Sequence, residues 1–355
     1  MPVSAQDARD GEPGAGGAAM SSGVVSRVTG VVKRHKRVVR LAVLALIIVF
    51  VGLAIQKSWA QLPEGFTWKV NWAYLVLAYL TLVAQELCFA LIWRAILARL
   101  GSRLAVVPAE RIYLNSEFVR YIPGNVWHVF TRVLWAEREG VPRVTGFASM
   151  TIELATKVAS AALVFAVSLL AWPDVRSAAG ALGQRGLPLT IAIVGVPLLL
   201  VGLHPRVLSW GLNFALRKLG RPAFTLSLGY RDLLAITGLW MASWIIAGLG
   251  FAMLVRALVP GSLSVAVIII CSGVYAIGWD IGFLSFITPS GLGFREAALA
   301  GLLVAAGLAP VWAVALAIAI VARLLVTAAE LVCVAGVHLV RGGSVSTGAG
   351  SRTAR

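Results

Sequence analysis

Long apolar runs, separated by short polar or basic segments, make up most of the chain. A run of about 20 apolar residues is long enough to cross a hydrocarbon core about 30 Å thick. On this pattern we expect spans at residues 41–55, 72–97, 145–172, 188–203, 233–258, 263–287 and 311–340. We therefore predict an all-α, polytopic helical membrane protein with about seven to eight spans. The eighth is a shorter apolar helix at 292–307, if it crosses the membrane.

Composition supports the same class. The chain is 59% hydrophobic and only 13% charged, with a mean hydropathy of +0.88, which excludes an ordinary soluble domain. The net charge of +16 sits in Lys and Arg at the ends of the apolar runs. Membrane proteins keep Lys and Arg at the cytoplasmic ends of their spans, so this placement argues against a nucleic-acid partner. The three cysteines lie inside apolar segments without paired spacing, so neither a disulfide framework nor a zinc site is expected.

The ends of the chain differ from its middle. We expect a disordered cytoplasmic tail at 1–32, a transmembrane domain at 33–341 and a flexible tail at 342–355. The basic cluster at 33–40 precedes the first apolar run, and this order fits either a signal peptide or an uncleaved first span. We favour the uncleaved span, with a cytoplasmic N-terminus in the inner (plasma) membrane. Basic and apolar residues mixed at 204–231 predict a helix lying in the cytoplasmic interface.

Charged residues inside the predicted spans need an explanation, because a charge at mid-bilayer costs roughly 2.5–3.5 kcal/mol on insertion scales. Glu153 and Lys157 are four residues apart, and Arg323 and Glu330 are seven apart, so each pair shares a helical face. Glu86 lies in the second span. These groups either pair inside the bundle or line a polar cavity, and the sequence leaves both readings open.

The segment at 109–139 is more polar and is broken at Pro123-Gly124. Proline lacks an amide hydrogen and glycine relaxes the backbone, so each half is too short to span. Both flanks are basic, which predicts a re-entrant helical hairpin. Its second arm would carry Asn125, His128 and Arg132 on one face.

A second break, at Pro289 to Gly293, precedes Arg295 and Glu296. A helix that restarts there presents amide hydrogens beside a guanidinium, which suits an anionic group such as a phosphate. Two broken helices in corresponding halves of a chain are a pointer to a transport site. The alternative is a kinked helix pair in which Glu296 merely favours the first turn. Gly278 and Gly282 predict close helix packing.

Catalytic and cofactor motifs are weak. The four histidines show no metal-binding spacing, and no phosphate loop or dinucleotide pattern is complete. We expect no enzyme activity, no cofactor and no metal site.

The two breaks carry a resemblance to a known family. The stretch from Arg120 to Asn125, followed by Arg132 and Glu153, resembles the first signature of the lysylphosphatidylglycerol synthase transmembrane-region family. The stretch from Thr288 to Glu296 resembles its second signature, with Arg323 matching a later arginine. The resemblance covers roughly residues 40–340. It implies a lipid-handling membrane domain without the aminoacyl-transfer domain of the synthases.

One departure concerns Lys157, which stands where many family members carry an acidic residue, and this puts any charge-pairing role there in doubt.

The leading hypothesis is a flippase for an anionic phospholipid or a polyprenyl-phosphate-linked glycolipid. The alternatives are an accessory subunit that docks a glycosyltransferase and a membrane-embedded transferase. In this hypothesis the two breaks meet near mid-membrane, arginines hold the phosphate and glutamates hold the arginines. The candidate substrate-binding residues are Glu117, Arg120, Asn125, His128, Arg132, Glu153, Ser290, Gly291, Gly293, Arg295, Glu296 and Arg323, and the helix breaks are Pro123, Gly124 and Pro289.

Overall fold

A computed structural model describes residues 69–121, 127–173, 195–218, 227–285 and 289–340, with a few isolated positions besides. The chain divides into a unit Met1–Ala54 and a unit Ile55–Arg355, and every element below belongs to the second. All regular structure among the described residues is helical. The expected tails and the span at 41–55 lie outside the described residues, apart from Leu53.

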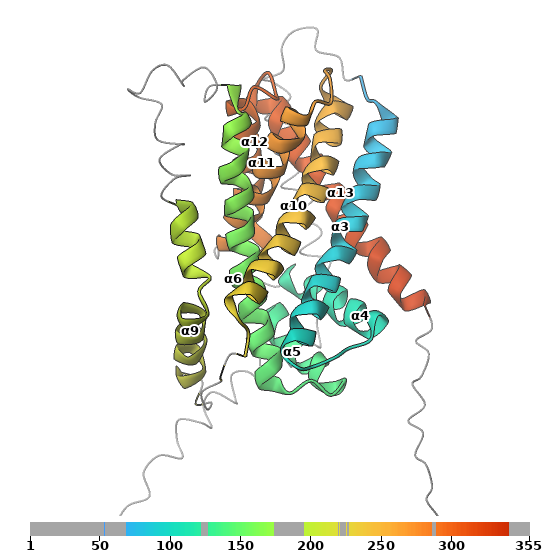
Figure 1. The fold of residues 1–355 in the computed structure, drawn as a ribbon. Helices are drawn as coiled ribbons and strands as arrows, with labels where there is room; N and C mark the ends of the chain where they lie inside the picture. The colour runs from blue at the N-terminus through green and yellow to red at the C-terminus, as the bar shows by residue number, and fades with distance from the viewer. Residues whose placement is uncertain are drawn as a thin grey trace, which may run out of the picture. The chain divides into compact units, whose positions relative to one another are not determined.

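Five helices are long and apolar enough to cross a membrane. They are α3 (Trp72–Arg99), α6 (Arg143–Ser168, continued by the 3-10 turn η2, Leu169–Ala171), α10 (Tyr230–Leu258), α11 (Val265–Leu284) and α13 (Trp312–Leu339). Each coincides with a predicted span (Figure 1). A sixth candidate is the helix Gly195–Gly202 together with α9 (Pro205–Lys218), which are bent by 63°. Five to six spans are thus found in the described part, whereas the expected total was seven to eight.

The long helices pack into one bundle. Helix α10 contacts α3, α6 and α11, and α11 also contacts α6. The core between them is rich in large aromatic side chains, such as the fully buried Trp93, Trp240, Trp244 and Phe251. Gly278 and Gly282 of α11 face α12 (Phe294–Ala305). A Cβ on Gly278 would press on Leu299, and one on Gly282 would press on Arg295. The predicted small-residue packing is therefore present, as expected for helices that approach closely in a membrane.

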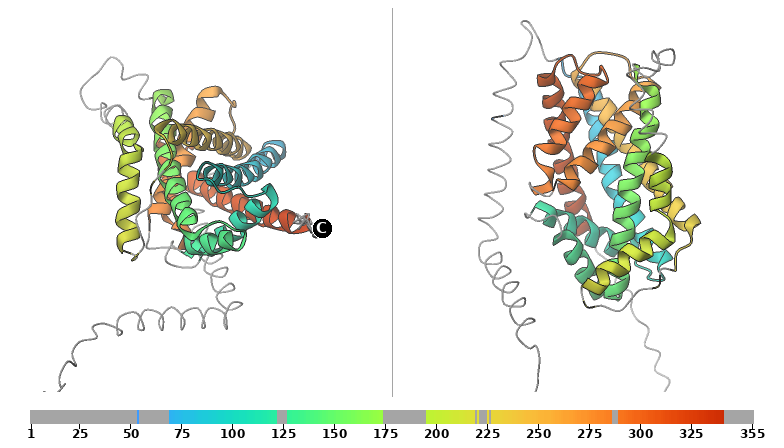
Figure 2. Two further views of the ribbon diagram at one scale, coloured as in Figure 1. Left: turned by 60° about the horizontal axis from the view of Figure 1, so that its bottom comes forward. Right: turned by 90° about the vertical axis from the view of Figure 1, so that its left-hand side faces the viewer.

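Shorter elements complete the bundle at one end. Helix α4 (Val106–Glu117), the 3-10 turn η1 (Phe118–Tyr121) and α5 (Trp127–Arg138) follow α3. Both flanks of this segment, the end of α3 and the start of α6, lie at the same end of the bundle (Figures 1 and 2). Entry and exit at one end are what the predicted hairpin requires. Its break at 122–126 lies outside the described residues, so the re-entrant hairpin stays a prediction.

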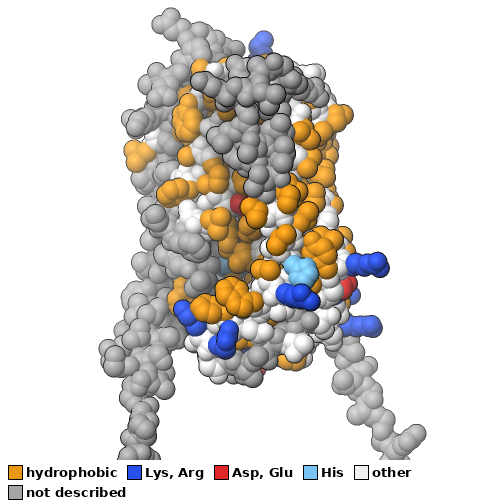
Figure 3. Space-filling model, turned by 60° about the vertical axis from the view of Figure 1, so that its left-hand side comes forward, with side chains coloured by type: hydrophobic (Ala, Val, Ile, Leu, Met, Phe, Trp, Pro, Cys, Tyr) orange, Lys and Arg blue, Asp and Glu red, His pale blue; other side chains and the backbone are white. Residues whose placement is uncertain are grey.

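Basic residues gather at that same end of the bundle. Arg99 of α3 pairs with Asp232 of α10 at 3.6 Å, and Arg143 of α6 pairs with Glu137 of α5 at 2.7 Å. Helix α9 lies there too and exposes Trp210, stacked on Phe214. In Figure 3 hydrophobic side chains cover the middle of the visible face, and most visible Lys and Arg lie toward the lower end. An apolar belt with a basic end is the surface expected of a multi-pass membrane protein.

Candidate functional site

The turn that precedes the first predicted break contacts the turn at the second. The 3-10 turn η1, at the end of the first half-helix, contacts the 3-10 turn η4 (Pro289–Gly291) that precedes α12. These turns are separated by about half of the chain, and helix packing brings them side by side. Pro123, Gly124 and Asn125 lie outside the described residues, as does the side chain of Arg120.

The second break depends on glycine. Ser290 and Gly291 have positive φ angles of 52° and 69°, and Gly293 follows with 87°. A Cβ on Gly291 would lie only 2.3 Å from the carbonyl oxygen of Gly282. Gly291 therefore lets η4 rest directly on the backbone of α11, which sets where α12 restarts.

Arg132 of α5 is the most deeply enclosed predicted site residue. Its guanidinium donates to Glu153 Oε2 and to Ser116 Oγ, each at 2.8 Å, and to Glu117. It also lies over the ring of Tyr113, 3.8 Å from the centroid, and the residue is fully buried. All three nitrogens are thus engaged by protein groups, which favours a structural role for Arg132 over the phosphate contact first assigned to it.

Tyr113 completes this network from α4, because its hydroxyl donates to Glu153 Oε1 at 3.0 Å. The sequence suggested that Glu153 pairs with Lys157 one turn away. The structure gives Glu153 an ion pair with Arg132 of another helix, at 2.8 Å.

Arg323 and Glu296 form a second buried ion pair. Arg323 Nη1 lies 3.4 Å from Glu296 Oε1 and donates to the Ser290 carbonyl oxygen at 3.1 Å. The other oxygen of Glu296 accepts the Gly293 amide at 2.7 Å, so it caps the restarted helix. Glu296 therefore fixes Arg323 and the start of α12.

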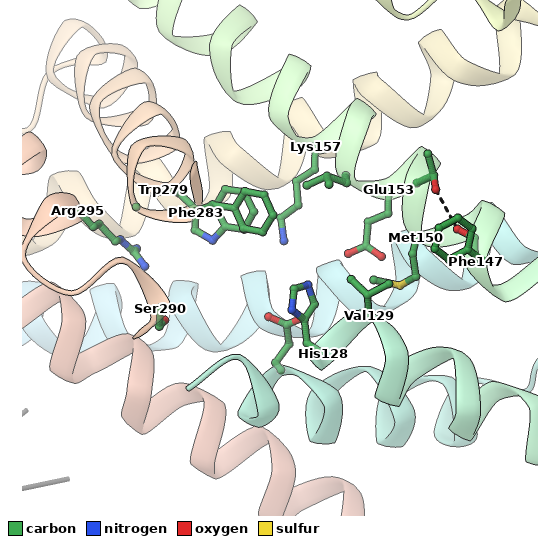
Figure 4. A pocket seen from close by; sticks show the side chains of 14 residues that line it. His128, Val129, Phe147, Met150, Glu153, Lys157, Trp279, Phe283, Ser290 and Arg295 are labelled. Carbon is green, nitrogen blue, oxygen red and sulfur yellow. Dashed lines mark hydrogen bonds between the residues drawn. The ribbon is translucent and has the colours of Figure 1, made fainter. Parts of the chain in front are cut away.

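A cavity of about 210 Å³ opens beside η4, between α5, α6, α11 and the start of α12 (Figure 4). Its lining includes five of the predicted site residues: Glu117, His128, Glu153, Ser290 and Arg295. The other predicted residues that are described lie behind this wall or beside it, in the helix restart and the two ion pairs: Arg132, Gly291, Gly293, Glu296 and Arg323. Residues on either side of the first predicted break and residues of the second thus line one site, and half of the described candidates face its interior.

Arg295 differs from the other two buried arginines. It sits in the first turn of α12, is 7% exposed, and lies over the Tyr275 ring at 5.1 Å. Within the described residues no carboxylate forms a salt bridge with it. Figure 4 shows its guanidinium directed toward Ser290 and the cavity interior. Arg295 is therefore the guanidinium best placed to meet an anionic ligand.

Nine lining residues were not among the predicted site residues, and three of them shape the cavity's chemistry: Lys157, Trp279 and Phe283. Trp279 and Phe283 are stacked one turn apart on α11, with parallel rings 5.2 Å apart. In Figure 4 this pair lies between Arg295 and Lys157. Aromatic residues inside an apolar span carry no distinguishing signal in sequence. Lys157 did stand out as a charge inside a span, and lining a polar cavity was one of the two readings left open for it.

The charges around the cavity leave a positive excess. Glu117 and Glu153 are both engaged by Arg132, so the two carboxylates of the wall share one buried cation. Lys157 and Arg295 add two further cations to the lining. The arrangement therefore favours an anion as ligand.

A second hollow, of about 490 Å³, adjoins the first and is almost entirely apolar. It lies between α6, the helix Gly195–Gly202 and the end of α11. The two hollows share four lining residues: His128, Val129, Leu154 and Phe283. A charged cavity thus continues into an apolar one, the arrangement that an amphipathic ligand requires.

Comparison with known proteins agrees with the resemblance carried by the two breaks. The family model for the lysylphosphatidylglycerol synthase TM region matches residues 37–331. No curated protein and no solved structure matches the chain. Because the matched region includes every described helix except the end of α13, the chain belongs to the lysylphosphatidylglycerol synthase transmembrane-region family.

Proposed function

We propose that this protein binds the phosphate-bearing headgroup of a membrane lipid and moves that lipid between leaflets, as a flippase. The observation that carries the proposal is the cationic cavity, lined by Arg295 and Lys157, that continues into an apolar hollow. A phosphate would meet the guanidinium through paired hydrogen bonds, and the hydrocarbon chain would lie in the hollow. The lipid classes in view are an anionic phospholipid and a polyprenyl-phosphate-linked glycolipid.

The size of the charged cavity limits what it holds. A buried site needs only about 10–15 Å³ of such space to hold one water, so a cavity of about 210 Å³ has room for a phosphate and further headgroup atoms.

The topology that goes with this proposal puts the basic end of the bundle in the cytoplasm of the inner membrane. The tail after α13 and the interfacial helix α9 would then face the cytoplasm. Seven spans result if the apolar run at 41–55 and the 188–203 region both cross the membrane, and eight if α12 is counted as well. The positive-inside bias supports this orientation.

The test is lipid movement in vesicles that contain only the purified protein. A fluorescent anionic phospholipid in the inner leaflet becomes accessible to an impermeant quencher only if it crosses. We expect Arg295→Gln to slow this crossing at least tenfold and Arg295→Lys to have an intermediate effect, because an ammonium does not match the two-point contact. Arg99→Gln, in a partly exposed pair outside the cavity, is the matched control and should be unchanged.

The outcomes separate the alternatives. Unchanged crossing in a folded Arg295→Gln protein would remove the cavity from the proposal. Crossing that needs an added glycosyltransferase would indicate the accessory subunit, and recovery of a chemically altered lipid would indicate a transferase.

A further inference from the structure

Lys157 lies inside a box of aromatic rings. Its Nζ is 3.7 Å from the ring centroid of Phe89, 4.4 Å from Trp279 and 4.9 Å from Trp240. These rings come from α3, α11 and α10, so three helices enclose a side chain of a fourth. The Tyr113 hydroxyl is 3.5 Å from the same nitrogen, and the lysine is 3% exposed.

Such a box is the usual protein site for an ammonium group. Aromatic faces carry negative potential and attract cations within about 6 Å of the centroid, and cages of several rings recognise choline and methylated lysine. Here the occupant is a lysine of the protein itself. The Tyr113 hydroxyl oxygen adds a polar contact to the same ammonium. Three aromatic faces and this oxygen thus favour a positive charge at this position.

The box is next to the ligand cavity. Lys157 and Trp279 both line that cavity, whereas Phe89 and Trp240 lie behind them. The lysine side chain therefore separates the cavity from the deeper rings. If the side chain were shortened, the box would become part of the cavity, and an ammonium from a ligand would have access to it.

We propose that the Phe89–Trp240–Trp279 box is an ammonium-binding site that Lys157 fills, so that the protein selects phosphate headgroups that carry no amine. This rests on the proposed function, because it assumes that the cavity receives a lipid headgroup. A ligand amine would find the box occupied and would meet the positive charges of Lys157 and Arg295. It would also find the carboxylates of Glu117 and Glu153 engaged by Arg132.

The first test uses choline as a soluble probe and the emission of the box tryptophans as the signal. The intact protein in detergent should show no saturable response. Lys157→Ala empties the box and should bind choline at least tenfold more tightly than the intact protein. Adding Trp279→Leu to Lys157→Ala should abolish the gain, because the cavity-side ring is lost. Lys157→Met, which refills the box with an uncharged chain of similar length, should not bind choline.

The second test compares short-chain phosphatidylglycerol with short-chain phosphatidylethanolamine. The intact protein should prefer the lipid without the amine, and Lys157→Ala should shift the preference at least tenfold toward the amine. Folding of each variant is checked by its thermal unfolding, with Lys157→Ser as a second variant if Lys157→Ala does not fold.

A folded variant with no gain in choline binding overturns the proposal and leaves Lys157 as a packing residue. If choline binds to Lys157→Ala but no lipid binds to any form, the box is confirmed and the lipid function fails. The two proposals therefore fail separately.

Discussion

Replacing Arg132 by methionine should destabilise the protein strongly while leaving the ligand cavity lined as before. The change removes a fully buried guanidinium and leaves Glu117 and Glu153 without their shared cation. At an effective dielectric constant of about 20, one charge pair at 2.8 Å attracts with about 6 kcal/mol. Desolvation offsets much of this, and loss of one partner from a buried pair costs about 3–5 kcal/mol. We expect the free energy of unfolding to fall by that amount.

The assay is equilibrium unfolding of purified protein in mixed micelles. Arg143→Met is the control, because its pair with Glu137 is largely exposed and should contribute about 0–1 kcal/mol. Adding Glu117→Gln and Glu153→Gln to Arg132→Met should restore most of the stability, since neutral amides no longer bury charge. If Arg132→Met unfolded like the intact protein and yet lost lipid binding, Arg132 would be a ligand and the structural assignment would be refuted.

Three further predictions concern the break, the hairpin and the apolar hollow. Gly291→Ala should lower stability by about 1–3 kcal/mol more than Gly307→Ala does. Both glycines have positive φ, but only Gly291 is crowded. Equal losses in thermal unfolding would contradict the contact of Gly291 with the Gly282 backbone. Cysteines at Ser102 and Arg143 should react with an impermeant thiol reagent from the same side, and labelling from opposite sides would make 109–139 a span. Ala155→Trp should fill the apolar hollow and block lipid crossing in a folded protein, and unchanged crossing would exclude the hollow from the lipid path.

The helices of this fold could be predicted because each long span is a continuous apolar run, and the bounds of α3, α10 and α13 fall within a few residues of the predictions. The second break was predictable because proline and glycine disfavour helix locally. The meeting of η1 with η4 was expected from the two breaks, but the residues that join them depend on which helices pack together.

The charge pairs show the limit of sequence reasoning. Helical spacing points Glu153 at Lys157, one turn away, but the structure pairs it with Arg132 from another helix. The box around Lys157 is drawn from Phe89, Trp240 and Trp279, which are far apart in the chain. No local pattern marks such rings, because an aromatic residue in an apolar span serves packing equally well.

The contrast among the buried arginines bears directly on function. A guanidinium inside a membrane protein is costly, roughly 2.5–3.5 kcal/mol at mid-bilayer on insertion scales. Two carboxylates offset this insertion cost at Arg132, and Glu296 offsets it at Arg323. Arg295, equally buried, has an aromatic ring and a cavity beside it but no salt bridge within the described residues. A carboxylate there would lower the cost and would also compete with an anionic ligand for the same nitrogens. Leaving Arg295 without one is thus what a phosphate-binding cavity requires, whereas a guanidinium kept only for packing would gain from a carboxylate partner.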